Sequence, residues 1–204
     1  MKIILLFLLA LNLVAQENDD FSVRFVYGKA TASTLGDVLS GKIESPEYDF
    51  NVAGVDGAYL LQRSAFDWPM DIYVKSGISR FSDSAYSLAS SKSVYEMTLY
   101  IKFYWNFDFL DNRVRFGFGE GGSYTSDILS VEQLEGEAGD AKSYFLNYLD
   151  ISADFDFGRL IHYRPLHNTY IGWALKHRSG IFGLVNGVTK GGSNYNTIYL
   201  EKNF

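Results

Sequence analysis

Residues 94–109 read VYEMTLYIKFYWNFDF and alternate between apolar and polar side chains almost without a break. Successive side chains of a β-strand point to opposite faces, so one face of this segment is apolar and aromatic and the other is polar. The segment is longer than a typical strand of a soluble sheet. It also exceeds the roughly 9–11 residues that a strand needs to cross a bilayer. The segment therefore predicts a transmembrane strand with its odd-numbered positions toward lipid, and favours this over a strand of a soluble β-domain.

The N-terminus is typical of an export signal. Lys2 is followed by an apolar run over 3–14, and Ala15 comes directly before a polar, acidic stretch. The run is shorter than the about 18 apolar residues that a transmembrane helix requires, and a small residue precedes the expected cleavage point. We therefore expect residues 1–15 to be a signal peptide and residues 16–204 to form one barrel domain. A retained membrane anchor is the alternative, but no stop-transfer sequence follows the run.

The composition excludes several classes of function. The chain has no cysteine, so disulfides, thiol catalysis and cysteine-based zinc sites are ruled out. The net charge of −6 argues against a nucleic-acid partner, which would require a basic surface. His162 and His167 lie in one expected turn without metal-ligand spacing, so we expect neither a metal nor a cofactor. The aromatic content of 17% suits the aromatic girdles of a membrane barrel.

Alternation and turn residues together predict an all-β fold, an eight-stranded antiparallel transmembrane β-barrel. The expected strands cover residues 21–29, 48–63, 69–81, 94–109, 112–122, 144–158, 168–179 and 193–204. Long connections rich in Ser, Gly, Asp and Glu, at 30–47, 82–93, 123–143 and 180–192, alternate with short ones such as Leu110-Asp111. Outer-membrane barrels show this pattern, with long extracellular loops and short periplasmic turns. We therefore expect an outer-membrane location with both termini in the periplasm.

Charged residues with inward parity predict a lumen filled by ion pairs. The set consists of carboxylates on the sixth strand and cations on the third to fifth strands: Asp150, Asp154 and Asp156 with Lys75, Lys102, Arg113 and Arg115. An eight-stranded barrel is just wide enough for side chains to fill, which argues against a general porin. A catalytic pair of acids inside the barrel is the alternative, because ion-pair networks and active sites both gather charges.

A histidine and a serine lie two residues apart on the outward face of the seventh strand. The outward parity of Trp173 and Leu175 continues to His177 and Ser179. A hydroxyl and an imidazole placed in this way can act as the nucleophile and the base of acyl transfer. Both would face lipid near the outer leaflet, where packing alone explains them poorly. The alternative is a pair of interfacial polar residues before a loop, because so short a motif often matches by chance.

His177-Arg178-Ser179 on the penultimate strand, followed by a Gly/Asn-rich loop and a final strand, resembles the lipid A 3-O-deacylases of the PagL type. The resemblance rests on this motif in the last third of the chain, and the rest of the chain resembles that family only in architecture. The resemblance implies that His177 is the base and Ser179 the nucleophile of an outer-membrane hydrolase. Such an enzyme removes an ester-linked acyl chain from lipid A, the membrane anchor of lipopolysaccharide, on the outer surface of the barrel.

Two positions depart from that family. Gly180 stands where the family usually has Asn, and Asn194 stands where it has the Glu that orients the histidine. Asn194 and Asn196 share the outward parity of the last strand, so either can reach His177 from there. An asparagine can orient a catalytic histidine, but it carries no charge to stabilise the imidazolium.

The remaining contacts to lipid A are expected from residues around the motif. They are Arg178 and Lys190 for the phosphates, together with Gly180 and Asn196. The alternative function is a non-catalytic outer-membrane barrel that serves a structural, adhesion or binding role through its extracellular loops, because a fold alone does not settle function.

Overall fold

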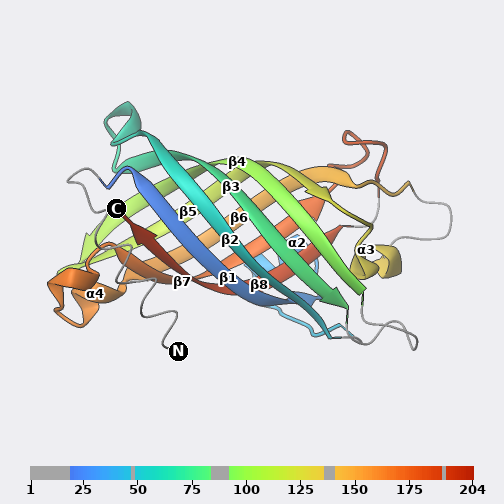
Figure 1. Ribbon diagram of the computed structural model, residues 1–204, viewed down its shortest axis with the longest axis horizontal. Coiled ribbons are helices and arrows are strands. Elements are labelled where there is room, and N and C mark those ends of the chain that lie inside the picture. The colour runs from blue at the N-terminus through green and yellow to red at the C-terminus, as the bar shows by residue number, and fades with distance from the viewer. Residues whose placement is uncertain (1–18, 47–48, 84–91, 136–140, 190–191) are drawn as a thin grey trace.

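The computed structural model describes residues 19–46, 49–83, 92–135, 141–189 and 192–204, and these form a closed antiparallel barrel (Figure 1). Each strand pairs with the next along the chain, and β1 pairs with β8 to close the cylinder. At the closure the backbone amide of Phe21 donates to the carbonyl of Phe204 over 3.2 Å, and the reverse bond spans 2.8 Å. The expected signal peptide lies outside the described residues.

The eight expected strands are confirmed, with ends that differ by a few residues. They are β1 (Phe21–Thr31), β2 (Phe50–Gln62), β3 (Met70–Asp83), β4 (Lys92–Phe109), β5 (Asn112–Thr125), β6 (Phe145–Asp156), β7 (Thr169–Ser179) and β8 (Ser193–Asn203). We call the end where β1 begins and β8 ends the terminal end, and the opposite end the loop end. The Leu110-Asp111 connection at the terminal end is a tight turn with φ of 49° and 58°.

The side-chain parity of β4 is as the sequence predicts. Leu99 points outward with 62% of its surface exposed, whereas Lys102 on the other face is 0% exposed. The outward faces of several strands together carry a broad belt of exposed apolar side chains. The belt includes Phe25, Tyr27, Ile78, Tyr95, Met97, Leu99, Phe107, Phe116, Phe118 and Ile198. Monomeric soluble proteins rarely expose apolar patches of this extent, so the belt is a surface suited to lipid.

The lumen is filled by side chains, with Arg24 of β1 at the centre of its charge network. The Arg24 guanidinium donates to Asp56 over 2.6 Å and to Asp150 over 2.8 and 3.2 Å, and Lys102 also pairs with Asp150. Arg115 forms a two-pronged pair with Asp154 at 2.8 and 2.9 Å. The salt-bridged lumen that the inward charges predict is therefore present, and Arg24 of β1 joins the cations that the sequence predicts for it.

Three of the expected pairings are wrong in detail. Lys75 pairs with Glu201 of β8 over 3.0 Å rather than with a β6 carboxylate. Arg113 pairs with Asp108 at the exposed terminal end. Asp156 accepts hydrogen bonds from the backbone amides of Arg159 and Asn168 and caps a short helix. Parity fixes which face a side chain occupies, but the stagger between strands decides which partners lie at the same height.

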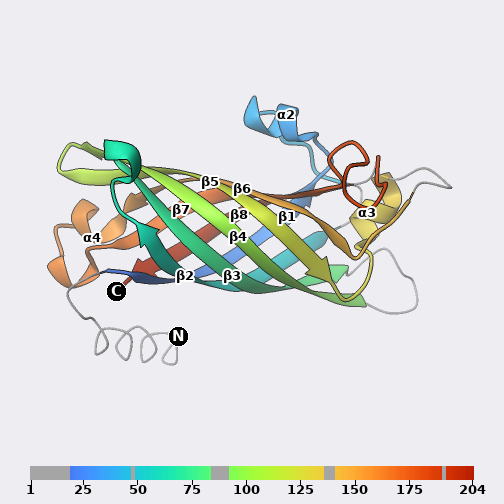
Figure 2. The ribbon, with the colours of Figure 1, turned by 90° about the horizontal axis from the view of Figure 1, so that it is seen from above.

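Short helices occupy connections that the sequence predicts only as loops or turns. They are α2 (Leu35–Leu39) and α3 (Ser130–Glu135) at the loop end, with η1 (Ala65–Asp67), α4 (Phe157–Leu160) and η2 (Arg164–Leu166) at the terminal end. Figure 2 shows α2 beside the barrel and α3 at the mouth of its loop end. None of the helices in the described ranges is long and apolar enough to span a membrane.

The segment that leads into α3 closes the loop end of the lumen. Leu129 and Val131 are buried in one apolar cluster with Phe50, Phe81 and Tyr195 from the barrel wall. The α3 segment therefore plugs the mouth from inside, and its Glu132 side chain is buried against β7 and β8.

Candidate functional site

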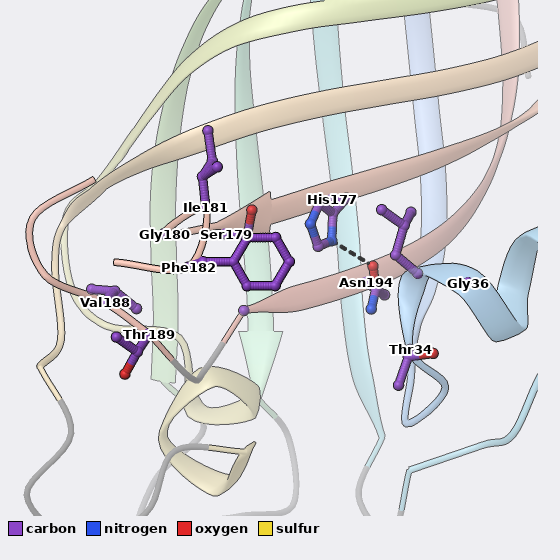
Figure 3. Close-up of a pocket in the computed structure, with 12 residues that line it drawn as sticks. Thr34, Gly36, His177, Ser179, Gly180, Ile181, Phe182, Val188, Thr189 and Asn194 are labelled. Carbon is purple, nitrogen blue, oxygen red and sulfur yellow. Dashed lines mark hydrogen bonds between the residues drawn. The ribbon is translucent and has the colours of Figure 1, made fainter. Parts of the chain in front are cut away.

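His177 and Ser179 line a pocket of about 450 Å³ on the outer surface of the barrel at the loop end (Figure 3). Both side chains lie near the C-terminal end of β7, on its outward face, and both are half-buried. The pocket brings the two residues together with Asn194 of β8. The three residues that the sequence groups together therefore lie close together in the fold, because β7 and β8 pair with His177 opposite Asn194.

A hydrogen bond fixes the imidazole of His177 on its Nδ1 side. His177 Nδ1 lies 2.7 Å from Asn194 Oδ1, and the amide nitrogen of Asn194 donates to the carbonyl of Ser33 over 3.0 Å. Because the Ser33 carbonyl can only accept, the amide of Asn194 must turn its nitrogen to that carbonyl and its oxygen to the imidazole. The proton of a neutral His177 then resides on Nδ1, and Nε2 is left as a free base.

One wall of the pocket is the segment at the start of α2, which the sequence did not connect with the site. Thr34, Leu35 and Gly36 line the pocket. The segment is held in place at its base, where the amide of Glu44 donates to the Ser33 hydroxyl over 2.9 Å. Thr34 caps α2 by accepting from the amide of Asp37 over 3.2 Å, as short polar side chains do at helix N-termini. The connection after β1 therefore has two roles, because it orients Asn194 and also encloses one side of the site.

The opposite wall is the connection after β7, from which Gly180, Ile181 and Phe182 line the pocket. A Cβ atom added to Gly180 would lie 2.1 Å from the carbonyl oxygen of Val188, well inside van der Waals contact. Glycine is therefore required at this position, where the connection folds back on itself. The departure from the PagL-type motif at Gly180 has a structural cause, because an asparagine does not fit the path of this chain.

Two of the residues expected to contact lipid A make other contacts, and a third cannot be placed. Arg178 points into the lumen with 1% of its surface exposed, where it pairs with Glu132 over 2.8 Å, so its expected contact with lipid A phosphates is wrong. Asn196 accepts a hydrogen bond from the indole of Trp173 over 3.3 Å, and it is Asn194 that reaches His177. Lys190 lies outside the described residues. The inward parity of Arg178 was itself the signal that it faces away from lipid.

The site lacks two features of a complete triad. Within the described parts of the chain, no hydrogen bond joins His177 to Ser179, and no carboxylate is bonded to the imidazole. A nucleophile and its base often tighten only when substrate binds, so the open geometry does not exclude the pair. Glu120 of β5 lies on the outward face in the same cross-strand row as His177, with Leu149 of β6 between them. Alternation over residues 112–122 already places Glu120 on an otherwise apolar outward face, so the sequence contains a signal for this carboxylate.

Solved structures of outer-membrane proteins share this architecture. The chain resembles the outer membrane enzyme PagL with a TM-score of 0.58 and 13% identity, covering 90% of this chain and 99% of that one. It resembles Neisserial surface protein A with a TM-score of 0.51 and 14% identity, covering 90% of this chain and 97% of that one. The fold is that of an outer-membrane barrel. No protein-family model matches the chain, and no curated protein matches it.

The two structural relatives differ in what their names describe, one being an enzyme and the other a surface protein. At 13–14% identity the likeness extends to the fold and no further. Function must therefore be argued from the chemistry of the site itself.

Proposed function

We propose that this chain is an outer-membrane esterase that removes an ester-linked acyl chain from lipid A at the pocket around His177 and Ser179. The observation that carries the proposal is the chain of hydrogen bonds from Ser33 through Asn194 to His177 Nδ1. These two hydrogen bonds select the tautomer that a general base needs, with Nε2 unprotonated and on the side of the imidazole away from Asn194.

The proposed reaction proceeds in two balanced steps. The Ser179 hydroxyl transfers its proton to His177 Nε2 while Oγ attacks the ester carbonyl, and collapse of the tetrahedral intermediate returns that proton to the departing sugar hydroxyl. Water then donates a proton to Nε2 and attacks the acyl-serine, which releases the fatty acid and regenerates the hydroxyl. Asn194 keeps the imidazole oriented throughout but contributes no full charge to the imidazolium.

The pocket lining supports a lipid ester as the substrate class. Apart from His177, none of its described lining residues is ionisable, and Leu35, Ile181, Phe182 and Val188 supply apolar surface. An uncharged lining suits an acyl chain and its ester better than a phosphate. The pocket also opens on the outward surface of the barrel, the surface that carries the apolar belt, so a lipid beside the barrel can reach it without leaving the membrane.

A second candidate is a non-catalytic outer-membrane barrel with a binding or adhesion role. It is favoured by the absence of a hydrogen bond between His177 and Ser179 among the residues described, and by the amide that replaces the orienting acid. On this alternative, the polar pair is an interfacial feature and the loop-end surface carries the function.

The two candidates are separated by a hydrolysis assay on the purified, folded barrel in micelles that contain lipid A. We expect fatty acid release from the wild type, detected by mass spectrometry, and its loss in both Ser179→Ala and His177→Ala. The double variant should be no worse than either single one, because residues that act as a unit are non-additive. Ser40→Ala, on the α2 connection but not in the pocket lining, is the matched control and should keep the wild-type rate.

The outcome that contradicts the esterase is also defined. If the folded wild type releases no fatty acid from lipid A, or if Ser179→Ala releases it at the wild-type rate, the enzyme proposal fails. Folding of each variant is checked by heat-modifiable migration in gels, so that a lost activity is not confused with a lost barrel.

A further inference from the structure

The connection after β7 is unusually apolar for a loop at the end of a barrel. Residues 180–189 read GIFGLVNGVT and contain no charged residue. The segment has the glycines expected of a long connection but none of the expected Ser, Asp or Glu residues. We call residues 180–189 the apolar loop.

The apolar loop has a fixed shape. The amide of Val185 donates to the carbonyl of Gly180 over 2.9 Å, and the amide of Gly183 donates to the carbonyl of Val188 over 2.9 Å. The side-chain amide of Asn186 ties the loop to the start of β6, where it donates to the carbonyl of Phe145 over 2.9 Å. These bonds hold the backbone in a compact turn rather than leaving it free to collapse onto the barrel.

The turn is strained in a way that projects its apolar side chains outward. Ile181 and Phe182 have φ of 48° and 53°, a left-handed conformation that branched and bulky residues rarely adopt. With this backbone, Phe182 is 95% exposed and Leu184 is 83% exposed. Strain of this kind persists only where the surrounding structure imposes it, so the exposure of the two side chains is built into the loop.

The apolar loop lies on the outward side of the barrel. The loop continues from β7, whose outward Trp173 is half-buried and pairs with Ile198 of the apolar belt. Phe182 lines the outward pocket beside His177 (Figure 3). In the connection after β1, whose residues 34–36 form the other wall of the pocket, Leu39 and Ile43 are also more than half exposed. Both connections that wall the pocket therefore carry exposed apolar side chains.

We propose that the apolar loop dips into the membrane, with Phe182 and Leu184 packed among the acyl chains of the bilayer lipids that surround the barrel. An apolar, uncharged segment beside a lipid-facing belt has a lower free energy among acyl chains than in water. The apolar belt on the same outward surface favours lipid over a protein partner as the occupant. The inference does not require ester hydrolysis, since a binding barrel with the same loop would also be anchored in this way.

The absence of cysteine from the chain allows a direct test by single-cysteine spin labelling. Phe182→Cys is labelled in the full-length protein and reconstituted into phosphatidylcholine vesicles. Collision of the nitroxide with oxygen, which concentrates in the bilayer, is compared with collision with a water-soluble nickel chelate. Leu99→Cys, on the outward face of β4, is the lipid control, and Ala141→Cys, exposed before β6, is the water control.

We expect the ratio of oxygen to nickel accessibility at Phe182 to approach that of Leu99 and to exceed that of Ala141 several-fold. A ratio equal to that of Ala141 would overturn the proposal, and so would a label shielded from both reagents, which would mean that protein covers the site. Leu184→Cys repeats the measurement if Phe182→Cys does not migrate as a folded barrel. A membrane-inserted loop on a protein without hydrolytic activity would leave this inference standing and refute the esterase alone.

Discussion

The Arg178 guanidinium donates to the Glu132 carboxylate over 2.8 Å inside the barrel, on the other side of β7 from the pocket. Ser193, next to Asn194 on β8, donates to the same carboxylate oxygen over 3.0 Å. Arg178 lies between His177 and Ser179 in the sequence, and alternation turns it inward while they face outward. The α3 plug therefore holds the two strands directly behind the candidate site.

The first prediction concerns the pH dependence of this contact. Burial raises the pKa of Glu132 above its ordinary value of 4.5, against the opposing influence of Arg178. The folded state then binds the proton more tightly than the unfolded state, so the contribution of Glu132 to stability is greatest below pH 4.5 and declines as the pH rises through the folded pKa. The free energy of unfolding, measured with urea on the reconstituted barrel, should decrease as the pH rises from below 4.5 through the folded pKa of Glu132. Glu132→Gln should reduce this decrease, and an unchanged pH dependence in that variant would contradict the assignment.

The second prediction tests the membrane-facing parity of β4. Ile101→Arg should impair insertion by about 2–4 kcal/mol if the residue lies near the bilayer midplane. Ile101→Leu is the matched control and should fold as the wild type does. The measurement is the folded fraction in vesicles as a function of urea. Equal stability of the arginine and leucine variants would show that position 101 does not face lipid.

The third prediction concerns conduction. Side chains fill the lumen and the α3 segment closes the loop end, with Leu129 and Val131 packed against the barrel wall. Purified protein in planar bilayers should therefore show no large, stable conductance. Porin-like currents from the wild type would contradict the filled lumen and would favour a transport function.

The fourth prediction concerns Arg24, which donates to both Asp56 and Asp150 and is 1% exposed. Arg24→Ala leaves two carboxylates with one cationic partner fewer in the lumen, and such truncations typically cost about 3–5 kcal/mol. Unfolding in urea should reveal the loss. Arg113→Ala removes a cation from an exposed pair at the terminal end and should cost much less. Similar losses for both arginines would contradict the central position of Arg24.

The fifth prediction separates the two hydrogen bonds of Asn194. Asn194→Ala removes both and should reduce the deacylation rate, though less than Ser179→Ala does. Asn194→Asp keeps an acceptor for His177 and adds a full charge, but it places a second acceptor against the Ser33 carbonyl. We expect a rate at or above that of the wild type, with a stability loss of about 1 kcal/mol from the lost bond. A rate as low as that of Asn194→Ala would show that the Ser33 contact matters more than the charge.

Asn194→Glu extends the same test. The longer side chain can reach past the Ser33 contact and supply the charge that the PagL-type family places at this position. We expect it to raise the rate if the imidazolium limits the reaction. Fatty acid release that stays absent in both the wild type and this variant would leave the His177–Ser179 pair without a catalytic role.

The barrel itself follows from the sequence, for a local reason. A strand repeats every two residues, so the alternation over 94–109 fixes both the existence of β4 and the face of each side chain. The same argument places His177 and Ser179 on one outward face and leaves Asn194 and Asn196 as the candidates beside them, between which the register of β7 against β8 decides for Asn194. These features need only the period of the strand and the order of neighbouring strands.

Tertiary structure decided what lies between strands and above them. Arg24 became the centre of the lumen because the stagger of the closed barrel brings β1, β2 and β6 to one height, which no single strand records. The Ser33 carbonyl that orients Asn194 comes from a connection 161 residues away in the sequence. The α3 plug and the apolar loop take their shapes from turns and strained backbone that have no repeating pattern. Alternation thus determines which face a residue occupies, and only the folded barrel determines what it meets there.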